Sequence, residues 1–109
     1  MPYRHGDVIA VPYEYSDLTG GKVRPALVVS SDAYNLARPN VVDAAISTQI
    51  ANVGKYDQVL AHWPSAGLRY PSLVRGRLRT IEQSLIRRSV GRLSALTWQA
   101  SRKNSRAFY

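Results

Sequence analysis

Short runs of β-branched and aromatic residues alternate along the chain with turn-forming segments rich in glycine, proline, serine and asparagine. Runs of this length are typical of strands, because a helix needs a longer apolar repeat at a spacing of about three to four residues. We therefore predict strands over residues 7–15, 24–31, 41–49, 57–63, 72–82 and 84–94. Residues 32–40, DAYNLARPN, contain a proline and are predicted to form at most one helical turn.

A single helix is predicted near the end of the sequence, over residues 95–103. Ser94 is a suitable N-cap, and the cations Arg102 and Lys103 suit the negative end of the helix dipole. Many short strands followed by one helix predict a mainly β fold, a small curled sheet or barrel in the SH3-like size range. The 109 residues fit one domain, residues 1–109, with no internal repeat or linker.

Positive charge is concentrated in the second part of the sequence. The chain carries 15 Lys and Arg residues against 7 Asp and Glu, a formal net charge of +8. Residues 69–109 hold ten of these cations and a single acid, Glu82. Most of the cations are arginine, whose planar guanidinium suits bidentate contacts with phosphate. We therefore expect an anionic partner: nucleic acid, an acidic membrane surface or an acidic protein.

The composition does not indicate a metal site, a cofactor or a membrane segment. Cysteine is absent, which excludes disulfides, thiolate catalysis and cysteine-based metal sites. The acidic residues are scattered and never take the spacing of metal ligands. No run of about eighteen apolar residues is present, and the first residues form no apolar signal segment. A cytoplasmic location without membrane association is therefore expected.

Two arginine-bearing segments are candidates for anion binding. In SLVRGRLRTIE, residues 72–82, Arg75, Arg77 and Arg79 alternate with other residues and so share one face of the predicted strand. Such a stripe suits phosphate, although it is also typical of a solvated sheet face. In GGKVRPALVVSS, residues 20–31, Arg24 stands at the entrance of an apolar strand, next to a proline that restricts the backbone. Taken alone, this pattern favours a structural arginine in a surface loop.

The order of the segments resembles a known family. GDVIAVPYEYSDLTGGKVRPALVVSSDAYN, then DAAISTQI, then PSLVRGRLRTIEQSLIRRSVGRLS are similar to the PemK/MazF toxins of type II toxin–antitoxin modules, from residue 6 to about residue 94. The resemblance implies an SH3-like barrel that forms a homodimer. It also implies a metal-independent, sequence-selective endoribonuclease that cleaves single-stranded RNA, in particular mRNA, needs no cofactor, and is silenced by a cognate antitoxin protein.

The resemblance assigns candidate roles to individual residues. The family's motif arginine falls on Arg24, which implies a catalytic role, since a fixed guanidinium stabilises the charge that develops on a phosphoryl group during cleavage. The family's threonine position is held by Ser47, the second candidate catalytic residue. Thr48 also carries a hydroxyl, but neighbouring strand residues face opposite sides, so only one of the two is expected to face Arg24. Thr48, Gln49 and Lys22 are candidate RNA contacts.

One part of the family pattern is missing. In the PemK branch an arginine is followed two residues later by an aspartate, and here Arg75 is followed by Arg77. Arg75 and Arg77 are therefore candidate RNA contacts, but they cannot form an arginine–carboxylate acid–base pair. Neither His5 nor His62 matches a catalytic position of the family. The group that removes the proton from the 2′-hydroxyl is left open.

Two other functions are compatible with the sequence. CcdB toxins are similar in fold and act without catalysis, by binding DNA gyrase. The replacement of threonine by Ser47 and the missing aspartate also fit a degenerate member that only binds RNA or an antitoxin. For an RNA-binding protein, Tyr13, Tyr15 and Tyr34 are candidates for stacking on unpaired bases.

Overall fold

The computed structural model describes residues 3–12 and 23–93. Several sequence predictions lie outside these residues: the helix over 95–103, the end of the first strand, and the side chains of Tyr13, Tyr15 and Lys22. No helix among the described residues is long and apolar enough to cross a membrane.

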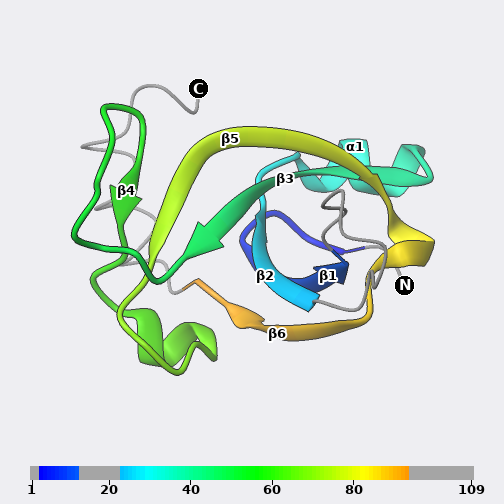
Figure 1. Ribbon diagram of the computed structural model, residues 1–109. Coiled ribbons are helices and arrows are strands. Elements are labelled where there is room, and N and C mark those ends of the chain that lie inside the picture. The colour runs from blue at the N-terminus through cyan, green and yellow to red at the C-terminus, as the bar shows by residue number, and fades with distance from the viewer. Residues whose placement is uncertain (1–2, 13–22, 94–109) are drawn as a thin grey trace.

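One antiparallel sheet forms the body of the described chain. Its strands are β1 (Asp7–Pro12), β2 (Val23–Val28), β3 (Asn40–Ser47), β4 (Gln58–Val59), β5 (Leu73–Glu82) and β6 (Arg88–Arg92). They are arranged in the order β4-β5-β3-β2-β1-β6. The sheet curls, so that β5 and β3 arch over β1, β2 and β6 (Figure 1). The prediction of a mainly β fold with a curled sheet is confirmed.

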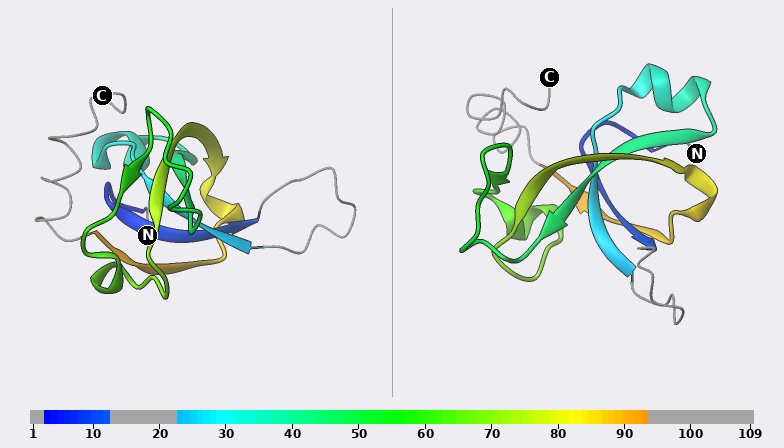
Figure 2. Two further views of the ribbon diagram at one scale, coloured as in Figure 1. Left: turned by 60° about the vertical axis from the view of Figure 1, so that its left-hand side comes forward. Right: turned by 45° about the horizontal axis from the view of Figure 1, so that its top comes forward.

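Within residues 3–12 and 23–93, three short helices connect the strands: α1 (Asp32–Ala37) and the 3-10 helices η1 (Trp63–Ala66) and η2 (Gln83–Leu85). Figure 2 shows α1 beside the end of the sheet where β3 begins. α1 is longer than the single turn predicted, because the Ser31 hydroxyl caps it by accepting the Tyr34 N–H at 3.1 Å. It ends where Arg38 turns extended before Pro39.

Two predicted strands differ most from the structure, because each is much shorter than expected. The strand over 57–63 is reduced to Gln58–Val59, because the chain turns away and Trp63 begins η1 with a proline in its first turn. The strand over 84–94 begins only at Arg88, because Gln83–Leu85 form η2. In both places a helical turn replaces residues whose apolar pattern resembles a strand.

The sheet carries a hydrophobic cluster on each side. Val8 and Leu27 belong to one cluster and Ile9 and Ala26 to the other, so the neighbouring strands β1 and β2 are buried on both faces. The first cluster is covered by η1, and the second reaches Ile81 near the end of β5 and Ile86 after η2. This packing makes β1, β2 and β3 a rigid base for the residues at their ends.

The 3-10 helix η1 lies directly on β6 where two glycines remove side chains. A Cβ on Gly91 would overlap the carbonyl oxygen of Ala66, and a Cβ on Gly67 would overlap that of Val90. Gly67 also has a φ of 84°, which favours glycine. The backbones of η1 and β6 can therefore approach closely only with glycine at both positions.

We expect Gly91→Ala to lower the free energy of unfolding by more than about 2 kcal/mol, because the added Cβ meets backbone that cannot rotate away. Urea unfolding followed by circular dichroism measures the effect. Ser89→Ala is the matched control on the same strand; Ser89 is exposed, so its change should stay within about 0.5 kcal/mol. Equal midpoints for the two variants would contradict the close contact.

Candidate functional site

A β-bulge interrupts the pairing of β5 with β3. Ala44 pairs with Leu78 and Ile46 with Val74, so Ala45 alone lies opposite the three residues Arg75, Gly76 and Arg77. Extra residues on one strand bend it and redirect its side chains. Figure 1 shows that β5 is strongly curved along its length. Two arginines of the predicted stripe therefore lie at an irregular point of the sheet.

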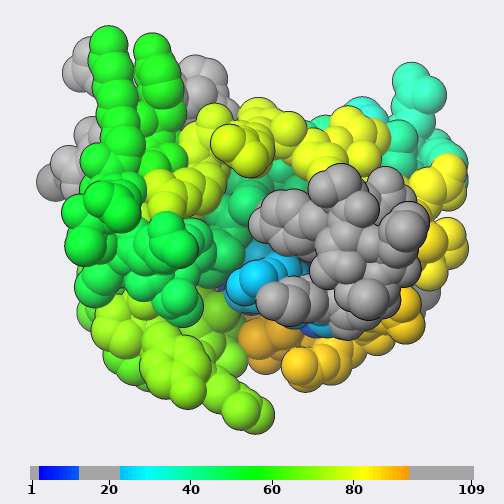
Figure 3. All heavy atoms as spheres, viewed as in Figure 1, coloured from blue at the N-terminus to red at the C-terminus, as the bar shows by residue number. Residues whose placement is uncertain are grey.

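A cavity of about 440 Å³ lies beside this bulge. It is formed by the start of β2, the end of β3 with the two residues that follow, and the bulged part of β5. On the face that Figure 3 shows, the start of β2 is exposed near the end of β3. The cavity brings together all the predicted site residues within the described chain: Arg24, Ser47, Thr48, Gln49, Arg75 and Arg77.

Arg24 is presented by a strand that is anchored in the core. It lies opposite Val11 in the β1–β2 pairing, and its side chain is exposed. Ala26 and Val28 lie on the same face of β2 as Arg24 and are completely buried in the second cluster. The buried half of β2 therefore fixes the backbone of the half that carries Arg24. This is the local reason why an arginine at the entrance of a buried strand has a defined position.

Ser47 and Thr48 both line the cavity, although they are adjacent in the sequence. Ser47 is the last residue of β3, and Thr48 lies beyond the strand. The alternation of strand faces stops at Ser47 and does not separate the two hydroxyls. The Ser47 Oγ accepts the N–H of Gln49 at 3.1 Å and keeps its own proton for donation. Ser47 is half-buried and Thr48 is exposed.

Asp57 is a partner of Arg75 that the sequence analysis missed. Its Oδ2 lies 2.7 Å from Nη1 of Arg75, and its Oδ1 accepts the N–H of Gly76 at 2.9 Å. Burial opposes the charged form, but the N–H donors of Gly76, Gly54 and Arg75 outweigh it and lower the pKa of the Asp57 carboxyl. Arg75 thus has a carboxylate partner after all. This partner comes from the segment before β4, whereas the family pattern places an aspartate two residues after the arginine, at the position of Arg77.

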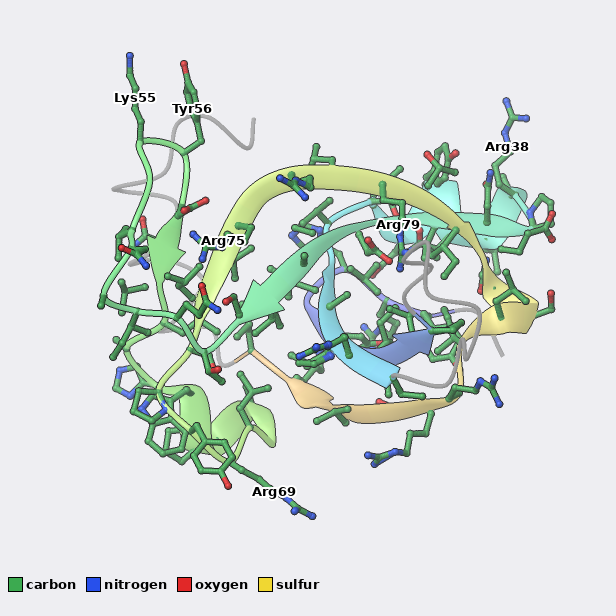
Figure 4. All side chains as sticks on the ribbon, in the orientation of Figure 1. Arg38, Lys55, Tyr56, Arg69, Arg75 and Arg79 are labelled. Atoms are coloured by element: carbon green, nitrogen blue, oxygen red, sulfur yellow. The ribbon has the colours of Figure 1, made fainter. Side chains whose placement is uncertain are left out.

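Asp43 and Arg79 form an ion pair farther along the same two strands. They lie opposite each other in the β3–β5 pairing, with Arg79 Nη2 and Asp43 Oδ2 separated by 3.5 Å. In Figure 4 the Arg79 side chain extends from β5 toward the interior of the curl. Burial raises the pKa of the Asp43 carboxyl, and the Arg79 guanidinium offsets this only in part.

This shift predicts how stability depends on pH. A carboxyl whose pKa is raised by folding adds stability below its ordinary value of 3.8, and that stability is lost as the pH rises through the raised pKa. We expect Asp43→Asn to remove this loss, so that the variant gains stability relative to the wild type from about pH 4 toward neutrality. Urea unfolding across this pH range measures the difference. A difference that does not change with pH would contradict the prediction.

The cavity lining is cationic in the part that the structure describes. Three arginines contribute to it, and no carboxylate or imidazole is among its described residues. His5 lies elsewhere, with Nδ1 3.1 Å from the Val29 carbonyl oxygen, and Tyr34 donates its hydroxyl to Asn40 at 3.2 Å. Within residues 3–12 and 23–93, no three His, Asp or Glu side chains form a group that could hold a metal ion. The described lining is thus built to stabilise negative charge.

Comparison with known proteins identifies the family of this scaffold. The family model of the PemK-like, MazF-like toxins of type II toxin–antitoxin systems matches residues 4–105. The chain belongs to the PemK/MazF toxin family. The resemblance inferred from the segment order is therefore confirmed. A search of curated proteins found no relative by sequence.

Solved PemK/MazF-type structures share the fold. Mycobacterium tuberculosis toxin MazF-mt6 superposes with a TM-score of 0.69 at 22% identity, covering 92% of this chain and 95% of that one. An endoribonuclease from a mycobacterial species, solved with its cognate antitoxin, gives 0.69 at 22% identity, covering 91% and 85%. MazE–MazF from Deinococcus radiodurans gives 0.68 at 20% identity, covering 95% and 91%. At such low identity these likenesses establish the fold of this PemK/MazF toxin.

Proposed function

We propose that this toxin is a metal-independent endoribonuclease that cleaves single-stranded RNA, in particular mRNA, and thereby inhibits translation. The observation that carries the proposal is the cavity whose lining contains three arginines, Arg24, Arg75 and Arg77, together with the hydroxyl-bearing Ser47 and Thr48. Guanidinium groups and hydroxyl donors around one space suit a phosphodiester group. Membership of the PemK/MazF family supports the proposed ribonuclease function, as does the likeness in fold to a mycobacterial endoribonuclease.

The chemistry follows from the groups that line the cavity. The 2′-oxygen of the RNA attacks the adjacent phosphorus, its proton passes to a base, and the 5′-oxygen leaves and takes up a proton. The products are a 2′,3′-cyclic phosphate and a 5′-hydroxyl. Negative charge grows on the non-bridging oxygens in the transition state, where Arg24 and the Ser47 hydroxyl stabilise it. Since the described lining holds no carboxylate or imidazole, we assign these residues to charge stabilisation, and the proton passes to a group outside this set.

Incubation of pure protein with a long RNA in the presence of EDTA tests the function. We expect cleavage at a limited set of sequences, with cyclic phosphate and 5′-hydroxyl ends identified by end mapping. An intact RNA would contradict the endoribonuclease proposal. RNA retention without cleavage would then indicate a protein that only binds RNA. Inhibition of gyrase supercoiling would indicate the CcdB-like alternative.

A cognate antitoxin is the proposed protein partner, and a cytoplasmic homodimer the proposed assembly. Two of the similar structures are complexes, one with a cognate antitoxin and one of MazE with MazF. An acidic, partly disordered antitoxin that folds on binding would complement the net charge of +8. Arg75 and Arg77 are the proposed shared contact, since arginine binds carboxylate and phosphate alike. RNA and antitoxin then compete for one surface.

Salt titration of RNA binding tests the arginine contacts. For the double variant Arg75→Ala, Arg77→Ala we expect weaker binding and a salt slope reduced by roughly one unit per lost contact. Of the single variants, Arg77→Ala should reduce the slope more, because Arg75 is already paired with Asp57 and Arg77 is exposed. Arg38→Ala is the matched control, since Figure 4 shows this exposed arginine at the other end of the molecule. An unchanged slope in the double variant would exclude both contacts.

A further inference from the structure

The carboxylate of Asp57 makes several hydrogen bonds that link the segment of residues 48–57 to the bulge of β5. Asp57 Oδ2 accepts the N–H of Gly54 at 2.7 Å and a guanidinium N–H of Arg75 at the same distance. Its Oδ1 accepts the N–H of Gly76 at 2.9 Å. Gly76 is the central residue of the bulge, where β3 offers only Ala45 to three residues of β5. Asp57 thus supplies the acceptor that the interrupted ladder does not provide at this point.

Arg75 is held by two residues of this segment, one in its middle and one at its end. Its Nη1 donates to the Asp57 carboxylate at 2.7 Å and to the carbonyl oxygen of Asn52 at 2.9 Å. The side chain of Asp57 is only 10% exposed and that of Arg75 27% exposed, so solvent competes weakly for the pair. In Figure 4 Arg75 lies between β5 and the segment before β4, whereas Lys55 and Tyr56 project away from the body. Both contacts are made by Nη1, so the N–H groups of Nη2 and Nε are available to bind another acceptor.

The residue in the centre of the bulge must be glycine for this arrangement. A Cβ on Gly76 would overlap the Cβ and the carbonyl oxygen of Tyr56. Tyr56 directly precedes Asp57, so the absence of a side chain at position 76 lets the 48–57 segment approach the backbone of β5. The glycine at position 76 therefore allows the close approach that brings the Asp57 carboxylate to Arg75.

We propose that Asp57 is a positioning residue that fixes the Arg75 guanidinium at the edge of the cavity and orients its remaining N–H groups toward the RNA phosphate. The inference rests on the proposed ribonuclease function. Asp57 is not among the residues that line the cavity, whereas Arg75 is, so Asp57 acts through Arg75 without touching the substrate. The hydrogen bonds that lower the pKa of Asp57 favour the ionised carboxylate, the form that pairs with Arg75 at neutral pH.

Positioning can be separated from simple charge neutralisation. Asp57→Asn removes one negative charge and frees Arg75, so electrostatic attraction of RNA should stay equal or increase. A freed guanidinium is no longer held in one orientation, and misplacement by about 1 Å can reduce the rate of a positioned reaction by roughly a hundredfold. The expected signature is therefore a ten- to hundredfold lower kcat with an unchanged or lower KM.

The matched control is Asp7→Asn. Asp7 also accepts a backbone N–H, that of Arg4, and pairs with an arginine, Arg92, and its side chain is 15% exposed. The two variants change the net charge equally, but Asp7 does not line the cavity and contacts none of its described residues. Asp7→Asn should leave kcat and KM within about twofold of the wild type. Circular dichroism and thermal unfolding verify that both variants fold.

A double-variant comparison tests whether Asp57 acts through Arg75. If it does, Asp57→Asn combined with Arg75→Ala should cleave no more slowly than Arg75→Ala alone. Additive losses would overturn the proposal, because Asp57 would then act independently of Arg75. A kcat for Asp57→Asn at or above the wild-type value would overturn it as well.

Nuclear magnetic resonance tests the arrangement without any need for cleavage. In the wild type we expect a protected Gly76 amide and a resolved Arg75 side-chain N–H signal, and in Asp57→Asn the loss of both. Retention of both signals in the variant would overturn the positioning role. Failure of the wild type to cleave RNA would overturn the proposed function alone, and the spectra would then decide by themselves whether Asp57 holds Arg75.

Discussion

Arg24→Ala should reduce RNA cleavage by roughly 10²–10³-fold while the protein remains folded. Arg24 lies at the start of β2 with an exposed side chain, so its loss removes charge stabilisation from the cavity without removing core volume. Single-turnover cleavage of a defined RNA at saturating enzyme measures the rate, and urea unfolding measures stability. The midpoint of unfolding should change little, because Ala26 and Val28 still anchor the strand.

Two further variants make the result specific. Arg24→Lys keeps the charge but loses the planar fork of donors, so we expect only partial recovery of the rate. Arg88→Ala removes an exposed arginine on β6, which does not line the cavity, and should cleave like the wild type apart from a small change in salt dependence. Full cleavage by a folded Arg24→Ala protein would remove the central claim of the proposed mechanism.

Ser47→Ala should slow cleavage by about a hundredfold, whereas Thr48→Ala should slow it by less than about tenfold. The reason is orientation: the Ser47 oxygen is held by the N–H of Gln49 at the end of β3, which leaves its proton free to donate, while Thr48 is exposed beyond the strand. A fixed donor stabilises the transition state without reorganisation. The same single-turnover assay compares both variants directly.

Ser47→Thr is the conservative control, since it restores the residue that the family pattern has at this position. It should retain most of the wild-type rate because the hydroxyl is kept. A larger loss for Thr48→Ala than for Ser47→Ala would show that Thr48 is the functional hydroxyl. Both residues line the cavity, so such a result would change the assignment without changing the location of the site.

The sequence was sufficient to predict which residues lie at the site, but it did not predict the contacts among them. The apolar runs around Val28 and Ile46 predicted the buried strands, and the resemblance carried by the segment order pointed to Arg24, Ser47 and Arg75. The structure brings these residues together around one cavity. Their roles in catalysis and RNA binding stay predictions. Local pattern was sufficient for the strands because strands that are buried on both faces need continuous apolar residues.

The contacts that were missed depend on tertiary structure. Asp57 and Arg75 are 18 positions apart, and nothing in the spacing of DQVLAHW indicates that its first residue contacts a bulge in another strand. The bulge itself arises from a mismatch between β3 and β5, which neither strand shows alone. The early end of β4 and the 3-10 helix at Trp63 were missed because the run VLAHW is apolar enough for a longer strand, while Pro64 favours a helical turn.

The bulge in β5 is a place where the activity could be lost without loss of the fold, in evolution or by protein engineering. Between the pairs Ala44–Leu78 and Ile46–Val74, β5 contains two more residues than β3. Two is the period of a strand, so deletion of Gly76 and Arg77 would leave every other side chain of β5 on its present face. A continuous ladder could then form without the arginine pair at the cavity. A lineage could lose the activity by one short deletion and keep a stable scaffold for binding its partners.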